Sequence, residues 1–148
     1  MKYSTRLSDA VHIMVYIELY KGQSLSSTDI SVSIQTNPTY VRQLMAKLKA
    51  ANLLQSTRGI AKPTLTRKPE QISLLDIYKA IEGEKPLLHL DTHVNPECNV
   101  GIYIQYALQD HYNTVQKTAE KSMAQITLQS IIETFREKCR SVYVSDQL

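Results

Sequence analysis

The sequence predicts a mainly α-helical fold, in which a winged helix-turn-helix domain precedes a long C-terminal helix. Side chains that can cap a helix occur at Ser26, Asn37 and Ser73. Each can accept a hydrogen bond from the free N–H groups in the first turn of a helix. Two short runs rich in Leu and Thr surround a turn after the second capped helix, as the strands of a wing do. Residues 100–139 contain no proline and one glycine, which predicts a helix, continuous or interrupted, far longer than the others.

The composition indicates one globular unit. Of the 148 residues, 43% are hydrophobic and 21% are charged, which suits a packed core and does not suit a disordered chain. Lys2 and Arg6 precede an apolar stretch that His12 and Glu18 interrupt, so we expect no signal peptide. The sequence has no apolar run of membrane length and no C-x-x-C pair, which favours a cytoplasmic protein without a disulfide framework.

The N-terminal part contains three predicted helices. In the first, "SDAVHIMVYIELYKG", apolar residues occur on nearly every side, as in a central buried helix. The second, in "LSSTDISVSI", has Ser26 as its N-cap and Asp29 three residues later. The third, in "QTNPTYVRQLMAKLKAAN", has Asn37 as its N-cap and Pro38 at its first position, where a missing N–H costs little.

The next segment predicts a wing and a fourth helix. In "LLQSTRGIAKPTLTR", two strand-like runs flank a turn that contains Gly59 and Pro63. In "ISLLDIYKAIEG", Ser73 and Asp76 form a predicted capping box, and Gly83 ends the helix.

The predicted organisation has four parts. Residues 1–83 form the winged helix-turn-helix domain, 84–99 a loop or linker with two prolines, 100–140 the dimerisation helix region, and 141–148 a tail. One side of the long helix can pack on the chain's own first helix while the other meets a second copy, although packing within one chain is the alternative. The apolar stripe of this region is Leu108, Tyr112, Val115, Ala119, Met123, Ile126, Ile131, Ile132 and Phe135.

The charge is unevenly distributed. The net charge is +3, yet the chain between Asp29 and Glu70 contains seven basic residues and no acidic one. Such a segment generates a positive potential that favours an anionic partner, whereas a plain solvated face is the alternative. The seven are Arg42, Lys47, Lys49, Arg58, Lys62, Arg67 and Lys68.

The third helix has a face suited to the DNA major groove. At 100° per residue its inner face consists of Val41, Leu44, Met45 and Leu48. Thr and Gln can hydrogen-bond to base edges, Arg can bind guanine or phosphate, and two alanines allow a close approach. The mixed Glu and Lys of an ordinary solvated helix are absent. The outward residues are Thr39, Gln43, Ala46 and Ala50, flanked by Arg42 and Lys49 on one side and by Tyr40 and Lys47 on the other.

Two predicted helices joined by a tight turn, followed by a wing, form a winged helix-turn-helix. Its second helix reads bases near its N-terminus. Arg58, beside Gly59 in the wing turn, can reach a minor groove or a phosphate, and Lys62 is the predicted phosphate contact. The predicted DNA-binding set is Thr39, Tyr40, Arg42, Gln43, Lys47, Arg58 and Lys62.

The segments "STRLSDAVHIMVYI", "NPTYVRQLMAKLKAANLLQSTRG" and "ISLLDIYKAIEG" resemble the Rrf2-type winged-helix regulators of bacteria, which include the iron-sulfur cluster regulator and repressors of nitric-oxide response and cysteine metabolism. The resemblance implies a homodimer, held mainly by the long helix, that binds a two-fold symmetric operator and usually represses transcription. It also implies that Thr39, Arg42 and Gln43 occupy recognition positions and that Arg58 enters the minor groove.

The chain departs from this family in two places. In "RGIAKPTL", residues 61–63 replace the usual wing glycines, so we expect a different and stiffer turn. Cluster-binding members have three cysteines before the long helix, and this chain has only Cys98 there. The resemblance therefore implies the cluster-free branch of the family, and no iron-sulfur cofactor is expected.

Two hypotheses concern a sensor. Cys98, at the predicted start of the long helix, is a candidate reactive thiol, because a helix N-terminus favours the thiolate; a small, partly buried apolar side chain is the alternative. His89, Asp91, His93 and Cys98 carry metal-binding groups, but the prolines around them favour a loop with solvated histidines. No metal site is therefore predicted. A small effector has no defined site in the sequence.

The leading functional hypothesis is a dimeric, sequence-specific DNA-binding regulator, with a repressor as the expectation from the resemblance. The alternative is a winged-helix module whose basic face binds an acidic protein. An enzyme is not expected, because the chain has no Gly-rich phosphate loop, nucleophile elbow or H-E-x-x-H motif.

Overall fold

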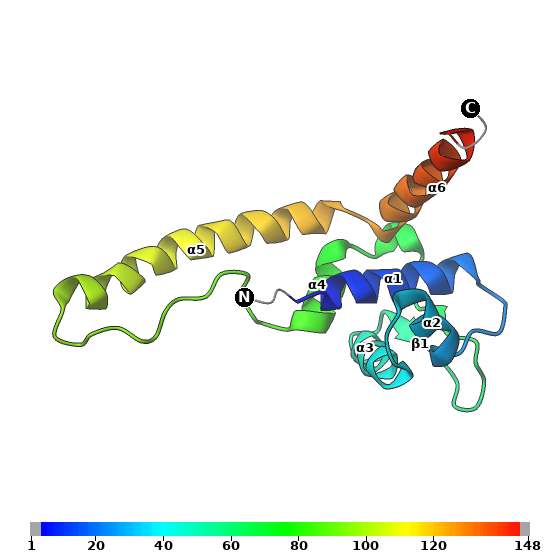
Figure 1. The fold of residues 1–148 in the computed structure, drawn as a ribbon, viewed down its shortest axis with the longest axis horizontal. Helices are drawn as coiled ribbons and strands as arrows, with labels where there is room; N and C mark the ends of the chain where they lie inside the picture. The colour runs from blue at the N-terminus through cyan, green and yellow to red at the C-terminus, as the bar shows by residue number, and fades with distance from the viewer. Residues whose placement is uncertain (1–3, 146–148) are drawn as a thin grey trace.

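Helices α1 to α4 and a two-stranded sheet gather at one end of the molecule, and α5 and α6 extend from them (Figure 1). The computed structural model describes residues 4–145. This arrangement confirms the predicted mainly α-helical winged helix-turn-helix fold. The elements are α1 (Arg6–Leu19), α2 (Ser27–Ile34), α3 (Pro38–Ala50), β1 (Leu54–Gln55), β2 (Thr64–Leu65), the 3₁₀ turn η1 (Pro69–Gln71), α4 (Leu74–Glu82), α5 (Asn99–Gln125) and α6 (Leu128–Ser145).

Helix α1 is the centre of the core. It contacts α2, α3, α4, α6 and β2, which explains why its apolar residues occur on nearly every side. The buried residues of α1 are Ala10, Ile13, Met14 and Ile17. The apolar faces of α3 and α4 also pack on α1. Their buried residues belong to the same hydrophobic cluster.

The predicted helix starts are confirmed. Ser26 Oγ accepts a hydrogen bond from the Asp29 N–H at 3.2 Å, and the Asp29 carboxylate accepts one from the Ser26 N–H at 2.8 Å. Ser73 and Asp76 form the same capping box at the start of α4. The Asn37 side chain accepts from the Tyr40 N–H at 2.8 Å, with Pro38 at the first helical position.

The wing is a short antiparallel pair, β1 with β2, joined by a turn that contains Gly59. The Ile60 N–H donates to the Thr57 carbonyl at 3.1 Å, and Gly59, at φ +80°, is the wing residue with a positive φ. This turn needs one glycine, so residues 61–63 can be other residue types. The Leu25 N–H donates to the Ala61 carbonyl at 2.6 Å, which ties the wing to the segment before α2.

The long helical region predicted for 100–140 consists of two helices, so the helix is interrupted. Ile126 is extended, and its carbonyl accepts from the Leu74 N–H at 2.8 Å. The Leu128 N–H donates to the Ile72 carbonyl at 2.8 Å, and Thr127 caps α6 by accepting from the Ser130 N–H at 3.0 Å. The helix breaks because this backbone pairs with the segment before α4.

The start of α6 packs on the N-terminal helices. Leu128 and Ile132 are buried in the hydrophobic cluster that the helices of residues 1–83 form. The predicted tail at 141–148 is helical as far as Ser145, and its residues 146–148 lie outside the described part of the chain.

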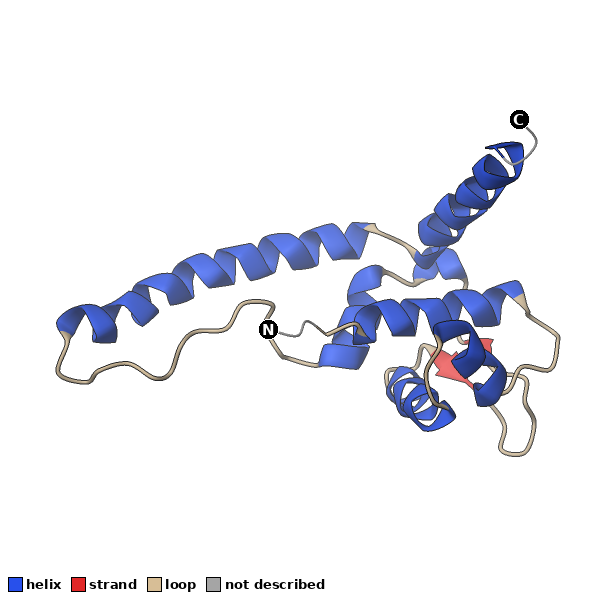
Figure 2. Cartoon of the chain, in the orientation of Figure 1, coloured by secondary structure: helices blue, strands red, loops and turns tan. Residues whose placement is uncertain are grey.

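Helix α5 projects away from the domain, and the linker after α4 runs beside it (Figures 1 and 2). Two glutamines of α5 hold this linker: Gln116 accepts from the Leu87 N–H at 2.9 Å, and Gln105 accepts from the Asp91 N–H at 3.1 Å. Not one residue of α5 is fully buried. Among the described helices, none is both long and apolar enough to span a bilayer.

Candidate nucleic-acid interface

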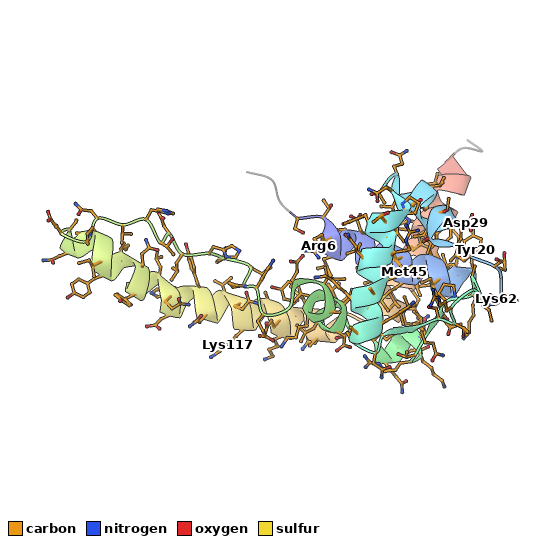
Figure 3. All side chains as sticks on the ribbon, turned by 90° about the horizontal axis from the view of Figure 1, so that it is seen from below. Arg6, Tyr20, Asp29, Met45, Lys62 and Lys117 are labelled. Carbon is orange, nitrogen blue, oxygen red and sulfur yellow. The ribbon has the colours of Figure 1, made fainter. Side chains whose placement is uncertain are left out.

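Helix α3 presents the predicted inner and outer faces. Val41, Leu44, Met45 and Leu48 are buried in the core. The residues between them are exposed on the outer side, so amphipathic packing on α1, α2 and α4 determines which side chains face solvent. Figure 3 shows α3 across the front of the domain and Lys62 at its edge. The exposed residues of α3 are Thr39, Arg42, Gln43, Ala46, Lys47, Lys49 and Ala50.

A tight turn sets α3 against α2. Gln35 has φ +58°, a left-handed conformation that ends α2, and the Thr36 N–H donates to the Ser31 carbonyl at 3.0 Å. Asn37 then starts α3 within the same turn. The short connection between the two helices is that of a helix-turn-helix, in which the start of α3 follows directly on the end of α2.

Five cations of α3 and the wing turn are exposed, and we call them together the basic face: Arg42, Lys47, Lys49, Arg58 and Lys62. None forms a salt bridge with an acidic residue in the described part of the chain. The described residues therefore leave these charges without a paired anion. A hollow between the start of α2, α3 and the wing contains Ser27, Arg42, Lys49 and Gly59 in its lining.

Arg42 is held by hydroxyl groups of two helices. Its Nη1 donates to Ser27 Oγ at 3.2 Å, and its Nη2 donates to Thr39 Oγ1 at 3.1 Å. Ser27 is not among the predicted residues, because it stands beside the Ser26 cap in the sequence and only the fold brings it to Arg42. Gln43 is exposed one position further along α3.

The side chains of Tyr40 and Lys47 each donate a hydrogen bond within the chain. The half-buried Tyr40 donates from its hydroxyl to Asp9 Oδ2 at 2.8 Å, so that hydroxyl is not free for DNA in this structure. Burial raises the pKa of Tyr40 to about 12, and the hydrogen bond to Asp9 contributes to the shift. Lys47 Nζ donates to the Ile81 carbonyl near the end of α4 at 3.3 Å. Lys47 as a whole residue remains exposed.

The candidate sensor residues lie far along the chain from the basic face. Cys98 is exposed at the N-cap position of α5, where its side chain forms no capping hydrogen bond. His93 Nδ1 lies 3.8 Å from Asp91 Oδ1, and the His93 side chain is 96% exposed. No three His, Cys, Asp or Glu side chains of the described residues are grouped so that they could hold a metal ion.

The fold and its basic face define a class of protein, the winged helix-turn-helix regulators of transcription. The chain belongs to the Rrf2 family: the family model, described as an iron-dependent transcriptional regulator, matches residues 3–134. The linker before α5 contains one cysteine, Cys98, so these residues do not fit a three-cysteine cluster site.

Two proteins of similar sequence are also named as transcriptional regulators. The chain is 34% identical over 129 residues to YwnA of Bacillus subtilis (strain 168), covering 87% of this chain and 96% of YwnA. It is 34% identical over 85 residues to YwgB of the same organism, covering 56% of this chain and 54% of YwgB. Both are named HTH-type transcriptional regulators, a class that is generally non-enzymatic.

Solved structures share the fold. A crystal structure described as that of a DNA-binding protein is 35% identical, with a TM-score of 0.71 over 86% of this chain and 98% of the other. CymR, described as the global cysteine regulator of B. subtilis, is 21% identical with a TM-score of 0.64 over 90% of this chain and 97% of its own. T. potens IscR is 24% identical with a TM-score of 0.67, over 93% and 90%.

The contact between Tyr40 and Asp9 gives a testable prediction. Tyr40→Phe should lower the free energy of unfolding at pH 7 by about 0.5–1.5 kcal/mol, the usual net value of one hydrogen bond. The pKa of Tyr40 is about 12 in the folded chain against 10.0 for an ordinary tyrosine, so its contribution is complete below about pH 10 and is lost toward pH 12. Denaturant unfolding should show a steeper fall for the parent than for Tyr40→Phe over this range.

Tyr20→Phe is the matched control, because Tyr20 is exposed and its hydroxyl forms no hydrogen bond with the described residues. Equal stability of the parent and Tyr40→Phe, at pH 7 and across the alkaline range, would show that the contact contributes nothing.

Proposed function

We propose that this regulator is a homodimer that binds a two-fold symmetric DNA operator in a sequence-specific manner and represses transcription from it. The observation that carries the proposal is the basic face, on which five exposed cations of α3 and the wing have no acidic partner in the described chain. DNA is the polyanion for which a helix-turn-helix presents such a surface.

The exposed start of α3 supplies the proposed base readers. Arg42, Gln43 and Thr39 lie in its first two turns, the part of a recognition helix that meets base edges. Arginine pairs with guanine and glutamine with adenine through two hydrogen bonds each. The small side chains of Ala46 and Ala50 further along the same side allow the helix to lie deep in the major groove.

The remaining cations are proposed phosphate contacts. Lys49 lies on the exposed side of α3, and Lys62 and Arg58 lie in the wing. Arg58 precedes Gly59 in the wing turn, and it is proposed to approach the minor groove beside the α3 site. Lys47 is proposed to contact phosphate with the donor positions that its bond to Ile81 leaves free.

The proposed dimer explains an exposed apolar face on α5. Val100, Ile104 and Val115 are 73%, 44% and 47% exposed, and at 100° per residue they lie on one side of the helix. Of the predicted stripe, Leu108 and Tyr112 are half-buried by the chain itself, whereas Val115 belongs to the exposed side. A second copy that packs along α5 would cover the exposed side, and two-fold symmetry would then set two α3 helices toward one duplex.

A repressor needs no contact beyond the operator, because a dimer bound over a promoter excludes the polymerase. The proposed signal acts through Cys98, whose exposed thiol stands at the start of α5. An adduct on this thiol would disturb the end of the proposed dimer helix. Iron-sulfur ligation is not part of the proposal, because the linker provides one thiol.

Alanine substitutions can distinguish the proposed base contacts from the proposed phosphate contacts. Arg42→Ala and Gln43→Ala should each weaken operator binding by about 1–3 kcal/mol while random DNA is bound nearly as before. Lys47→Ala and Lys62→Ala should weaken both DNAs about equally and reduce the salt slope by about 1, because each loses a phosphate contact. Fluorescence anisotropy over a salt series measures both quantities.

Parent binding that does not respond to salt would contradict the proposal of DNA as the partner and favour an acidic protein. Equal losses on both DNAs for all four variants would show that base readers and phosphate contacts have been assigned wrongly.

The dimer can be tested on α5. Ile104→Glu places a charge on the exposed apolar side and should raise the dimer dissociation constant about tenfold or more, because a buried charge is costly. Gln109→Glu adds the same charge at an exposed polar position on the other side of α5 and should leave the constant unchanged. Analytical ultracentrifugation measures both, and a monomeric parent would contradict the proposal.

The Cys98 signal can be tested with a maleimide, which forms a thioether with a thiolate. Alkylation should weaken operator binding by the parent and by Cys139→Ser, which removes the other exposed cysteine. Cys98→Ser should be insensitive. A Cys98→Ser protein that loses operator binding to the same extent as the parent would exclude Cys98 as the responsive residue.

A further inference from the structure

The guanidinium of Arg42 is bound on two sides before any DNA is present. Ser27 Oγ accepts from Nη1 at 3.2 Å, and Thr39 Oγ1 accepts from Nη2 at 3.1 Å. Ser27 is the first residue of α2, and Thr39 is in the first turn of α3. The Arg42 side chain therefore bridges the two helices of the helix-turn-helix.

We infer that Ser27 is a positioning residue that sets Arg42 to recognise one base of the operator, with guanine as the preferred base. The inference rests on the proposed DNA-binding function and adds a residue from the first helix of the motif to its specificity. Ser27 is not expected to read a base itself.

The physical reason is pre-organisation. A free arginine side chain occupies many rotamers, and it loses this freedom when it binds a base. The two hydroxyls restrict those rotamers in advance, so less freedom is lost on binding. A guanidinium has five N–H donors, and the two bonds to Ser27 and Thr39 leave three for guanine or a phosphate.

The chemistry of the two acceptors supports this role. Both are neutral hydroxyls, and Arg42 has no salt bridge with an acidic residue of the described chain, so its full charge remains available to DNA. A carboxylate in place of Ser27 would hold Arg42 as well but would neutralise it. Ser27 and Arg42 both line the hollow between α2, α3 and the wing, on the side of the basic face.

Ser27 can be changed without removing a helix cap. The capping bonds of α2 belong to Ser26 and Asp29. Ser27→Ala should therefore retain the melting temperature of the parent. Ser27→Thr keeps the hydroxyl and serves as the conservative variant. Thr28→Ala is the matched control, because Thr28 is exposed in the same turn and its side chain has no hydrogen bond with the described residues.

The test measures base preference by the full chain. The probes are the duplex that the parent prefers in a random pool and all single-base variants of that duplex. Arg42→Ala identifies the base pair that Arg42 reads. At this position Ser27→Ala should reduce discrimination roughly three- to tenfold, which corresponds to one net hydrogen bond. Ser27→Thr should restore it, and Thr28→Ala should match the parent at every position.

A double-mutant cycle separates positioning from a general structural effect. If Ser27 acts through Arg42, Ser27→Ala should change nothing further in the Arg42→Ala background. Unchanged base preference in Ser27→Ala, or an equal loss in both backgrounds, would overturn the inference while leaving the proposed function intact. A parent that prefers no duplex over another would overturn the proposed function and this inference together.

Discussion

The apolar contact between α3 and the rest of the domain is the interaction on which the candidate interface depends. Four residues of α3, Val41, Leu44, Met45 and Leu48, are buried against a core centred on α1. Because the helix repeats every 3.6 residues, burying these four also determines which side chains face outward. Arg42, Gln43 and Lys49 are exposed as a direct result. A rotation of α3 would bury the charge of Arg42 or Lys49.

Local signals in the sequence were sufficient for most of the fold. Both capping boxes, the start of α3 at Asn37 and the wing turn at Gly59 each involve residues within a few positions of one another. The two faces of α3 follow from periodicity alone. These features depend on short-range geometry, and a single sequence contains that information.

The features that were missed depend on contacts between distant parts of the chain. The position of the break between α5 and α6 is set by the pairing of Thr127 with Ser73, and nothing near Thr127 in the sequence indicates that partner. Tyr40 was predicted to face DNA, but its hydroxyl is bound by Asp9, 31 positions earlier. The bond from Arg42 to Ser27 likewise spans 15 positions and requires the helix-turn-helix to form first. Periodicity places a residue on a face and does not identify its partner.

The break in the C-terminal helix also joins the two halves of the molecule. Ile72 and Leu74 form backbone hydrogen bonds with Leu128 and Ile126, each at 2.8 Å, beside the start of α4. Leu128 is buried in the winged-helix core, so the junction of α5 and α6 is part of that core. The direction of α5 is therefore set by the domain that carries α3 and the wing. In the proposed dimer, the packing of two α5 helices would determine the spacing of the two basic faces.

In the proposed homodimer, the basic faces of the two protomers bind one symmetric operator. The most direct test is selection of bound duplexes from a random pool by the full-length protein at physiological salt. If the protein binds as the proposed dimer, we expect a two-fold symmetric motif. Its half-sites should be separated by about one turn of the double helix, 10–10.5 base pairs, or a multiple of it. A pool without an enriched motif, or one with a single unsymmetrical site, would contradict it.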